Sequence, residues 1–464
     1  MPLRRFPLRA CLPAGAVLAS TLLAAALPAT ATTAAAAAAT TAATTTAATT
    51  AASATRSYRQ GDCGKFTIAA IPDTQNYLDF RHQKSAGFPV DAHEMFFAQM
   101  QYIADNARSN GGDIVFATHL GDIWQNRVQR IDPGHAERGF KAAPEELTGG
   151  APKFFADPVR NHEIPMAVKG FERIAGKLPF SVVPGNHDYD GVWVDADNPP
   201  DPDNAALPQG IRHFGGLEGF RSAFSDQSAF FRDQPWYIAS NDGGADSAQV
   251  FTAGQCRLLH IGLQYDAPDS SLAWARRVIR QNPGLPTIVT THKYTGRDGR
   301  RAVGGPLDMS LIDPQDNNPQ MVWDKFISQH DQIFLVLSGH IGGQGHGVDY
   351  NDTGNEVHQM LSDYQPRWRA ARIADPQGHH ADRPLTGDGW LRLLSFDLDR
   401  DTPRIHVRTY STHFGRFASQ MPEYAEWYRD GEGQAGMDPD TFLARDEFTV
   451  ELTGFHPRFG APAR

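Results

Sequence analysis

Cysteine is scarce in this sequence, since 464 residues contain only three. So few cysteines exclude a disulfide-held scaffold and a zinc site built from clustered cysteines. Basic residues are not in excess either, because 43 Lys and Arg stand against 53 Asp and Glu. A protein whose main partner is nucleic acid usually has a basic surface, so this balance disfavours that partner. Hydrophobic residues at 41% and aromatic residues at 10% are typical of a globular protein with a buried core.

Long apolar runs are also lacking, apart from one near the start. The uncharged run Leu12–Leu27 follows three arginines and precedes the small residues Ala29, Thr30 and Ala31. This order predicts a cleaved secretory signal over residues 1–31, and the run is short for a membrane span. We therefore expect a secreted or extracytoplasmic protein that has no transmembrane span in its mature form.

An Ala/Thr-rich segment over residues 32–60 follows the predicted signal. It has no periodic apolar face, so we interpret it as a flexible linker that could bring the protein close to a cell wall. Cys63 and Cys256 are then the two cysteines of the mature chain. They could pair in an oxidising compartment, but the sequence leaves this open.

From residue 64 onward, short apolar runs rich in β-branched residues stop at clusters of Asp, Asn, His and Gly. Such runs predict buried strands, and helical patterns over Asp91–Ala107 and Ser271–Gln281 separate some of them. The predicted strands and the residues that follow them are Phe66–Ile71 before Asp73 and Gln75, Ile114–Ala117 before Gly121 and Asp122, Phe180–Val183 before Gly185, Asn186, His187 and Asp188, Thr287–Thr290 before His292, and Ile333–Leu337 before Gly339 and His340. Ligands in open α/β sheets gather beyond the carboxyl ends of strands, so we expect these side chains at one edge.

Each of these clusters has an ordinary explanation when it is taken alone. Asp73 could cap a turn, Asn186 could occupy a tight corner beside Gly185, and His292 could be a core histidine. Turn chemistry does not explain why carboxylates, an amide and imidazoles follow five separate strands. Together they match a site for two divalent metals with mixed oxygen and nitrogen donors.

The same motifs, in the same order, resemble those of the calcineurin-like metallophosphoesterases. The resemblance covers roughly residues 64–412 and implies an α/β fold, a four-layer α-β-β-α sandwich of two mixed sheets. Residues near 127–179 and 189–255 would be insertions that roof the site and select the substrate, and residues 413–464 a C-terminal extension. The strands expected to supply the second sheet are Glu356–Leu361, Trp390–Asp397 and Arg404–Tyr410.

The resemblance also implies an activity and a role for each residue. It implies a phosphoesterase that hydrolyses phosphomonoesters or phosphodiesters by attack of a metal-activated hydroxide, with two divalent ions chosen from Mn, Fe, Zn, Mg and Ca. Asp122 would bridge both ions, Asp73 and Gln75 would bind one, and Asn186, His292 and His340 would bind the other. His187 would stabilise the transition state or protonate the leaving oxygen, Asp188 would orient it, and Asn126 would contact phosphate.

Two departures from the family pattern leave other functions open. Gln75 stands where the family usually has histidine, and an amide oxygen is a harder, weaker ligand that favours Mn²⁺, Mg²⁺ or Ca²⁺. Gly342 stands where many relatives have a second histidine, and His346 in the Gly-rich loop 342–347 is a candidate replacement ligand. The alternatives are a single-metal protein that binds a phosphate polymer without cleaving it, and a secreted nuclease, which the acidic balance disfavours.

Overall fold

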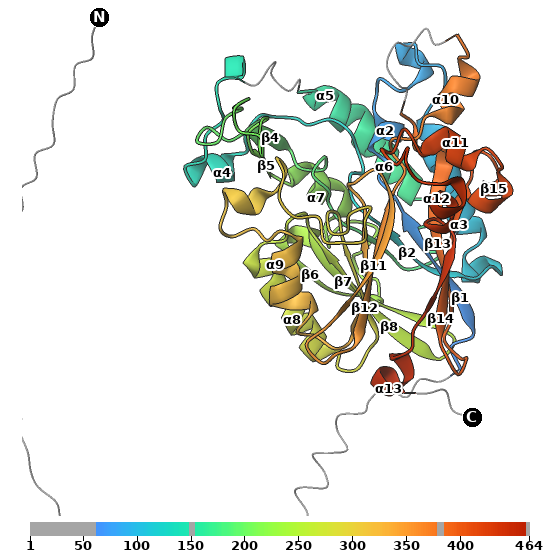
Figure 1. Ribbon diagram of the computed structural model, residues 1–464. Coiled ribbons are helices and arrows are strands. Elements are labelled where there is room, and N and C mark those ends of the chain that lie inside the picture. The colour runs from blue at the N-terminus through green and yellow to red at the C-terminus, as the bar shows by residue number, and fades with distance from the viewer. Residues whose placement is uncertain (1–61, 148–153, 378–384, 461–464) are drawn as a thin grey trace, which may run out of the picture. The chain divides into compact units, whose positions relative to one another are not determined.

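The computed structural model describes residues 62–147, 154–377 and 385–460. The predicted signal over 1–31 and the predicted linker over 32–60 lie outside these described residues. The described chain forms two large mixed sheets with helices, as expected for an α/β protein (Figure 1). Within it, every helix is too short or too polar to cross a membrane.

The first sheet contains the N-terminal strands of the described chain. Its order is β15 (Arg416–Phe417), β14 (Arg404–Ser411), β13 (Trp390–Asp397), β1 (Lys65–Ile71), β2 (Ile114–His119) and β3 (Phe180–Val182), with β16 (Phe448–Glu451) also paired to β14. Strands β1, β2 and β3 are parallel to one another, and the remaining pairs are antiparallel.

The second sheet also has a parallel centre and antiparallel edges. Its order is β11 (Gly343–Tyr350), β12 (Glu356–Asp363), β10 (Ile333–Ser338), β9 (Thr287–Thr291), β8 (Cys256–Leu263), β7 (Asp246–Ala253) and β6 (Tyr237–Asn241). Strands β12, β10, β9 and β8 are parallel. A separate two-stranded hairpin consists of β4 (Gly191–Val194) and β5 (Arg212–Gly215).

The five predicted strands are confirmed, but one expectation about the sheets is wrong. Strands β1, β2 and β3 lie in one sheet, whereas β9 and β10 lie in the other. The three later strands do not form a second sheet together, because β12 pairs with β10 while β13 and β14 extend the sheet of β1. Strand periodicity shows which faces are buried, but long-range contacts decide which strands pair.

Helices lie on the outer faces of both sheets and around their edges. Their bounds are α2 (Gln75–Leu78), α3 (His93–Asp105), α4 (Pro133–Glu137), α5 (Ala156–Pro158), α6 (Ile164–Phe171), α7 (Glu218–Phe224), α8 (Asp269–Gln281), α9 (Pro319–Val322), α10 (Arg369–Ala374), α11 (Tyr424–Tyr428), α12 (Pro439–Ala444) and α13 (Phe455–Phe459). Helix α8 buries Leu272, Ala275 and Ile279 against the second sheet, which is the spacing of an amphipathic helix.

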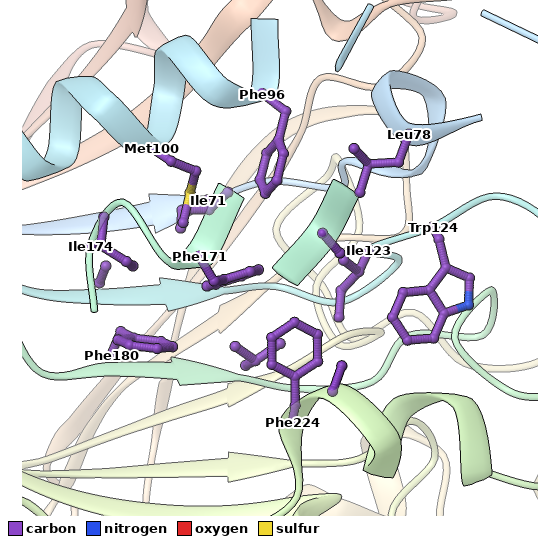
Figure 2. Close-up of a cluster of buried hydrophobic side chains, with 14 of the residues drawn as sticks. Ile71, Leu78, Phe96, Met100, Ile123, Trp124, Phe171, Ile174, Phe180 and Phe224 are labelled. Carbon is purple, nitrogen blue, oxygen red and sulfur yellow. The ribbon is translucent and has the colours of Figure 1, made fainter. Parts of the chain in front are cut away.

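Three main apolar clusters hold these layers together. Phe66 and Phe116 of the first sheet meet Phe251 and Phe334 of the second in one cluster. A second cluster packs the other face of the first sheet against α3, α6 and α7, and Figure 2 shows part of it. In the third cluster, helix α8 packs against the second sheet. This arrangement is compatible with the expected four-layer α-β-β-α sandwich.

The described part of the C-terminal segment 413–464 belongs to the same structure. Its residues Phe448–Glu451 form β16, which pairs with β14. Asp446 accepts hydrogen bonds from Tyr364, Tyr424 and Arg392, and all four side chains are buried. Removing this segment would therefore leave a buried guanidinium without its carboxylate.

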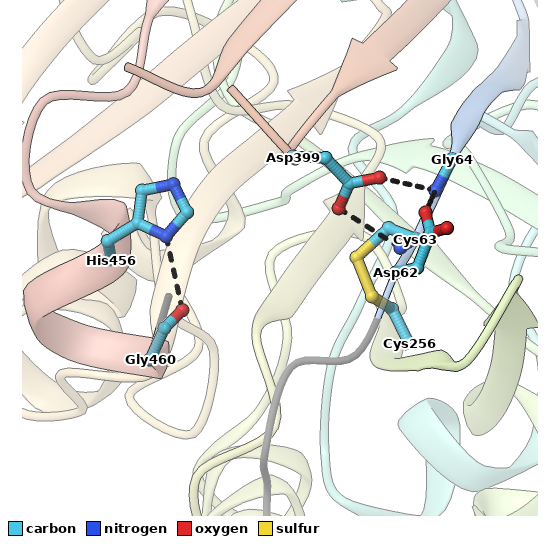
Figure 3. The surroundings of a disulfide bond; sticks show 7 residues. All are labelled: Asp62, Cys63, Gly64, Cys256, Asp399, His456 and Gly460. Carbon is cyan, nitrogen blue, oxygen red and sulfur yellow. Dashed lines mark hydrogen bonds between the residues drawn. A yellow bond between two sulfur atoms is a disulfide. The ribbon is translucent and has the colours of Figure 1, made fainter. Parts of the chain in front are cut away.

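A disulfide joins Cys63 and Cys256, so the pairing that the sequence left open is present (Figure 3). Cys63 lies two residues before β1 and Cys256 is the first residue of β8, so the bond ties the two sheets together at one end. Asp399 accepts hydrogen bonds from the backbone N–H groups of Cys63 and Gly64, which fixes the chain just before β1.

Candidate metal centre

Six predicted ligands meet where the parallel strands of the two sheets end. Asp73 and Gln75 follow β1, Asp122 follows β2, Asn186 follows β3, and His292 and His340 follow β9 and β10. We call these six residues the candidate metal centre. All except His340 are buried, so five polar side chains are gathered away from solvent. Such groups are stable there only when they are paired.

Backbone conformation shows how tightly these loops are held. Asp122 and His340 have φ values of 55° and 70°, in a region that residues with a Cβ atom rarely adopt. Ile123 and Trp124 are buried in the apolar cluster of Figure 2, so the chain that leaves Asp122 is anchored in the core. Strain of this kind persists only where the surrounding structure imposes it, and it is often found at functional sites.

Three motif glycines are required by the close approach of the loops. A Cβ atom at Gly185 would lie 2.3 Å from Oδ1 of Asp122, and one at Gly339 would lie 2.1 Å from Oδ1 of Asp73. A Cβ atom at Gly121 would lie 2.6 Å from Nδ1 of His292. Any larger residue would push a candidate ligand out of place.

The Nε2 atom of His292 lies at the middle of three other potential ligand atoms. It is 3.2 Å from Oδ2 of Asp122, 3.2 Å from Oδ1 of Asn186 and 3.2 Å from Nδ1 of His340. Its Nδ1 atom lies 2.8 Å from the carbonyl oxygen of Leu120, which can only accept a hydrogen bond, so Nδ1 carries a proton. A proton on Nε2 could point to only one of the three neighbours, whereas a cation satisfies them all. The donor set therefore fits a divalent metal.

Two residues that the sequence interpretation missed, Asp363 and Gln365, lie beside the candidate metal centre near Asp73. Gln365 donates from Nε2 to Asp363 over 3.2 Å and lies 3.5 Å from Oδ2 of Asp73. Gln75 donates from Nε2 to Oε1 of Gln365 over 2.6 Å and to Oδ2 of Asp122 over 3.2 Å. The buried Oε1 atom of Gln75 has no hydrogen-bond partner among the described residues, which a metal would correct. Asp363 ends β12 as the other ligands end their strands, and that signal could have identified it.

The carboxylates of this centre crowd one another. Burial, followed by repulsion from Asp363 and Asp122, raises the pKa of Asp73 well above its usual value. Burial likewise raises the pKa of Asp363 to about 6. Burial opposes the ionisation of Asp122, but His292 and His187 outweigh it and lower the pKa of that carboxyl. Three buried carboxyl groups that repel one another are the arrangement that a bound cation stabilises.

His187 lies at the edge of the candidate metal centre. Its backbone N–H donates to Oδ1 of Asp122 over 2.7 Å, and its Nε2 atom lies 4.0 Å from Oδ2 of the same residue. Its Nδ1 atom donates to the carbonyl oxygen of Gln125 over 2.8 Å, so Nε2 is the atom that faces the centre. Burial, followed by the charge of Arg127, lowers the pKa of His187 to about 4.

Asp188 does not orient His187, contrary to the expectation from the sequence. Its carboxylate accepts hydrogen bonds from the backbone N–H groups of Gly185, Ile123 and Trp124, over 2.7, 2.8 and 3.3 Å. It therefore fastens the loop after β2 to the loop after β3. The sequence places Asp188 beside His187, but successive side chains in a tight turn point in different directions.

Asn126 is not positioned to contact a substrate either. It is buried, and its Nδ2 and backbone N–H groups donate to the carboxylate of Glu163 over 2.6 and 3.0 Å. Arg81 donates to its Oδ1 atom over 3.4 Å. Its hydrogen-bonding capacity is used within the fold, so Asn126 has a structural role.

His346 does not join the candidate metal centre. The Gly-rich stretch expected to be a loop forms part of β11, which pairs with β12 in regular antiparallel register. The imidazole of His346 lies 3.3 Å from that of His358 and stacks on Phe448 at 5.0 Å. Glycine spacing suggested a loop, but the edge strand tolerates these glycines because β12 supplies the hydrogen bonds.

A cavity of about 370 Å³ opens beside Asn186 and His187. Its walls include three guanidinium groups, those of Arg127, Arg130 and Arg212, together with apolar side chains of the β4–β5 hairpin. Arg127 donates to the carbonyl oxygen of Asn186 over 3.1 Å, and it has no acidic partner within ion-pair distance in the described chain. The sequence interpretation placed a substrate-selecting roof in these insertions but did not identify the arginines. Arginines scattered over 86 residues carry no local pattern.

The sequence matches no protein-family model and no curated protein. The fold and the donor set by themselves define an α/β protein of two mixed sheets, with a cluster of candidate ligands for divalent metals where parallel strands end.

Proposed function

We propose that this protein is a metal-dependent phosphoesterase with a calcineurin-like metallophosphoesterase fold. The observation that carries the proposal is the convergence of Asp122, Asn186 and His340 on the Nε2 atom of His292, each at 3.2 Å. Two divalent cations would neutralise the phosphoryl oxygens of a substrate and activate a water molecule. Oxygen and imidazole donors of this kind suit such ions.

The chain's own residues supply the remaining functions. Asp122 accepts hydrogen bonds from the backbone N–H of His187 and from Nε2 of Gln75, so both of its oxygens are fixed in position. His187 presents Nε2 to the same space, and the negative charge of a phosphate ester would raise its lowered pKa on binding. We infer that His187 takes up a proton with the substrate and passes it from Nε2 to the leaving oxygen.

The arginine-lined cavity supports an anionic substrate. A guanidinium group matches the geometry of phosphate oxygens and forms charge-assisted hydrogen bonds with them. Arg127 lies between the cavity and the candidate metal centre, because it contacts both Asn186 and His187. The apolar walls formed by Val192, Trp193 and Phe214 favour a leaving group with apolar or aromatic character.

The disulfide supports the expected extracytoplasmic location. Disulfides persist in oxidising compartments and are rare where thiols are kept reduced. Cys63 and Cys256 are both fully buried, and their bond joins the two sheets. We therefore propose that the protein acts outside the cytoplasm.

Turnover of model esters tests the proposed activity. The purified protein is assayed with an aryl phosphate and a diaryl phosphate, after chelation and after addition of Mn²⁺, Mg²⁺, Ca²⁺ or Zn²⁺. We expect chelation to abolish hydrolysis and a divalent ion to restore it. His187→Ala should lower kcat about 10²–10⁴-fold while metal content stays unchanged. The matched control is His406→Ala, because His406 is exposed on β14 and contacts Thr449.

A single-metal phosphate-binding protein is the second candidate function. The first metal site has an amide in place of an imidazole, and the position of Gly342 cannot hold a histidine without movement, since its Cβ would lie 2.5 Å from Pro366. One metal ion per chain, with no turnover of either ester under any ion, would favour this function and refute the esterase. Hydrolysis of single-stranded DNA in the same assay would instead favour a nuclease.

A further inference from the structure

A second group of metal-ligand side chains lies outside the candidate metal centre. It consists of His135 in α4, His213 in β5, and Asp313 and Asp316 after Met309, and we call it the His213 cluster. One potential ligand atom from each of His135, His213 and Asp313 lies within 4.8 Å of the others. Oδ2 of Asp316 lies 3.4 Å from Nε2 of His213, which adds a fourth donor.

Both imidazoles are held in the manner of metal ligands. Nδ1 of His135 lies 2.6 Å from Oδ2 of Asp132, and Nδ1 of His213 lies 2.8 Å from the carbonyl oxygen of Phe214. An oxygen at Nδ1 keeps the proton there and leaves the lone pair on Nε2. Metal-ligating histidines are usually fixed by such a carboxylate or carbonyl oxygen.

The cluster is largely buried, although His135 is partly exposed. His213 is 1% exposed, and its Nε2 atom makes no hydrogen bond to any described residue. Trp193 stacks on its ring at 4.9 Å. A Cβ atom at Gly215 would lie 2.2 Å from Oδ2 of Asp132 and 2.5 Å from Nδ1 of His135, so the hairpin backbone packs directly on this pair. The Nε2 atom of His213 faces carboxylate oxygens of Asp316 and Asp313 at 3.4 and 3.7 Å, so a cation placed between these groups would satisfy all three.

We propose that the His213 cluster binds one structural Zn²⁺ ion, independently of the candidate metal centre. Two imidazole nitrogens and two carboxylate oxygens are donors of the type that zinc binds with tetrahedral geometry. The ion would tie together three segments that are distant in sequence: α4, β5 and the turn around Asp313. Strand β5 also carries Arg212 of the arginine-lined cavity, so this ion would hold one wall of that cavity in place.

Arg138 competes with a metal at this site. Its guanidinium donates to Oδ2 of Asp313, and the side chain is 36% exposed, so it can move outward into solvent. The competing occupant of the cluster is a proton on Nε2 of His213, balanced by Asp313 and Asp316. A proton needs no particular arrangement of His135, whereas a metal does. Substitutions at His135 and at Arg138 therefore separate these two states.

Zinc binding to the whole protein is the test, with Zn²⁺ alone as the probe. The candidate metal centre is first disabled by Asn186→Ala and His340→Ala, and Zn²⁺ per chain is then measured after dialysis. We expect one ion to remain, and we expect Co²⁺ in its place to give the strong visible absorption of a tetrahedral site. His213→Gln should abolish this binding, Asp132→Asn should weaken it about 10–100-fold, and Arg138→Gln should strengthen it.

The control variant is His330→Gln, which removes a half-buried histidine from another part of the protein. It should keep the zinc ion. If the variant lacking Asn186 and His340 does not fold, the same comparison uses the otherwise unaltered protein, where His213→Gln must lower the zinc content by one ion. A folded His213→Gln protein that keeps all of its zinc would refute the proposal. So would His135→Gln with unchanged zinc affinity.

Discussion

Loss of the Cys63–Cys256 disulfide should lower the stability of the fold while leaving the candidate metal centre unchanged. The bond closes a loop with a sequence separation of 193 residues, which is long for a single crosslink. It lies before β1, whereas Asp73 follows that strand, so about 30 Å of extended chain separates them. We therefore expect Cys63→Ala/Cys256→Ala to bind divalent metals and turn over substrate at 25 °C as the unaltered protein does.

The size of the effect follows from the loop length. In the chain-entropy description, closing a loop of this size removes unfolded-state entropy worth about 5 kcal/mol at 25 °C. The roughly 390 described residues unfold with an entropy of about 0.8 kcal/mol/K. Dividing the two predicts a fall in Tm of about 6 °C. Both cysteines are fully buried, so replacing their sulfur atoms adds a smaller packing loss.

Calorimetry of the two single variants and the double variant separates the crosslink from the packing. The first substitution should cause nearly the whole fall in Tm, because either one removes the bond, and the second should add little. Thiol titration of the denatured protein with and without reductant confirms that the bond was present. Equal, additive losses from the two substitutions, or a double variant with an unchanged Tm, would refute the reasoning.

Two other predictions concern buried carboxylates near the site. Asp188→Ala leaves three buried backbone N–H groups without an acceptor, at about 1–3 kcal/mol each, so Tm and metal retention should both fall; an unchanged Tm would contradict its fastening role. Burial raises the pKa of Glu163 from 4.5 to about 7, so folding takes up a proton and this group disfavours the fold increasingly as pH rises through that range. The free energy of unfolding of Glu163→Gln, measured by denaturant titration, should therefore rise by up to about 3 kcal/mol relative to that of the unaltered protein between pH 4 and pH 8. A difference that does not change with pH would contradict this.

Local patterns in the sequence determined the strands and the polar residues that follow them. The sequence predicted strands at Phe66–Ile71 and Thr287–Thr290, because a buried strand must be apolar along its own length. Asp122 and His292 were readable as ligand candidates because each follows such a strand directly. The helical pattern of α8 could also be predicted, because one turn of a helix involves only residues that are close together in the chain.

The tertiary structure decided what those residues face. Asp188 fastens two loops, although it directly follows His187, and His346 lies in an edge strand beside His358, although it is only six residues after His340. Asp363 and Arg127 reach the site from segments that carry no motif, and the two cysteines meet across 193 residues. The sequence by itself determined the elements and the order of the candidate ligands, because these depend on residues close together in the chain. Strand pairing and side-chain direction depend on contacts between distant segments, which only the packed sheets establish.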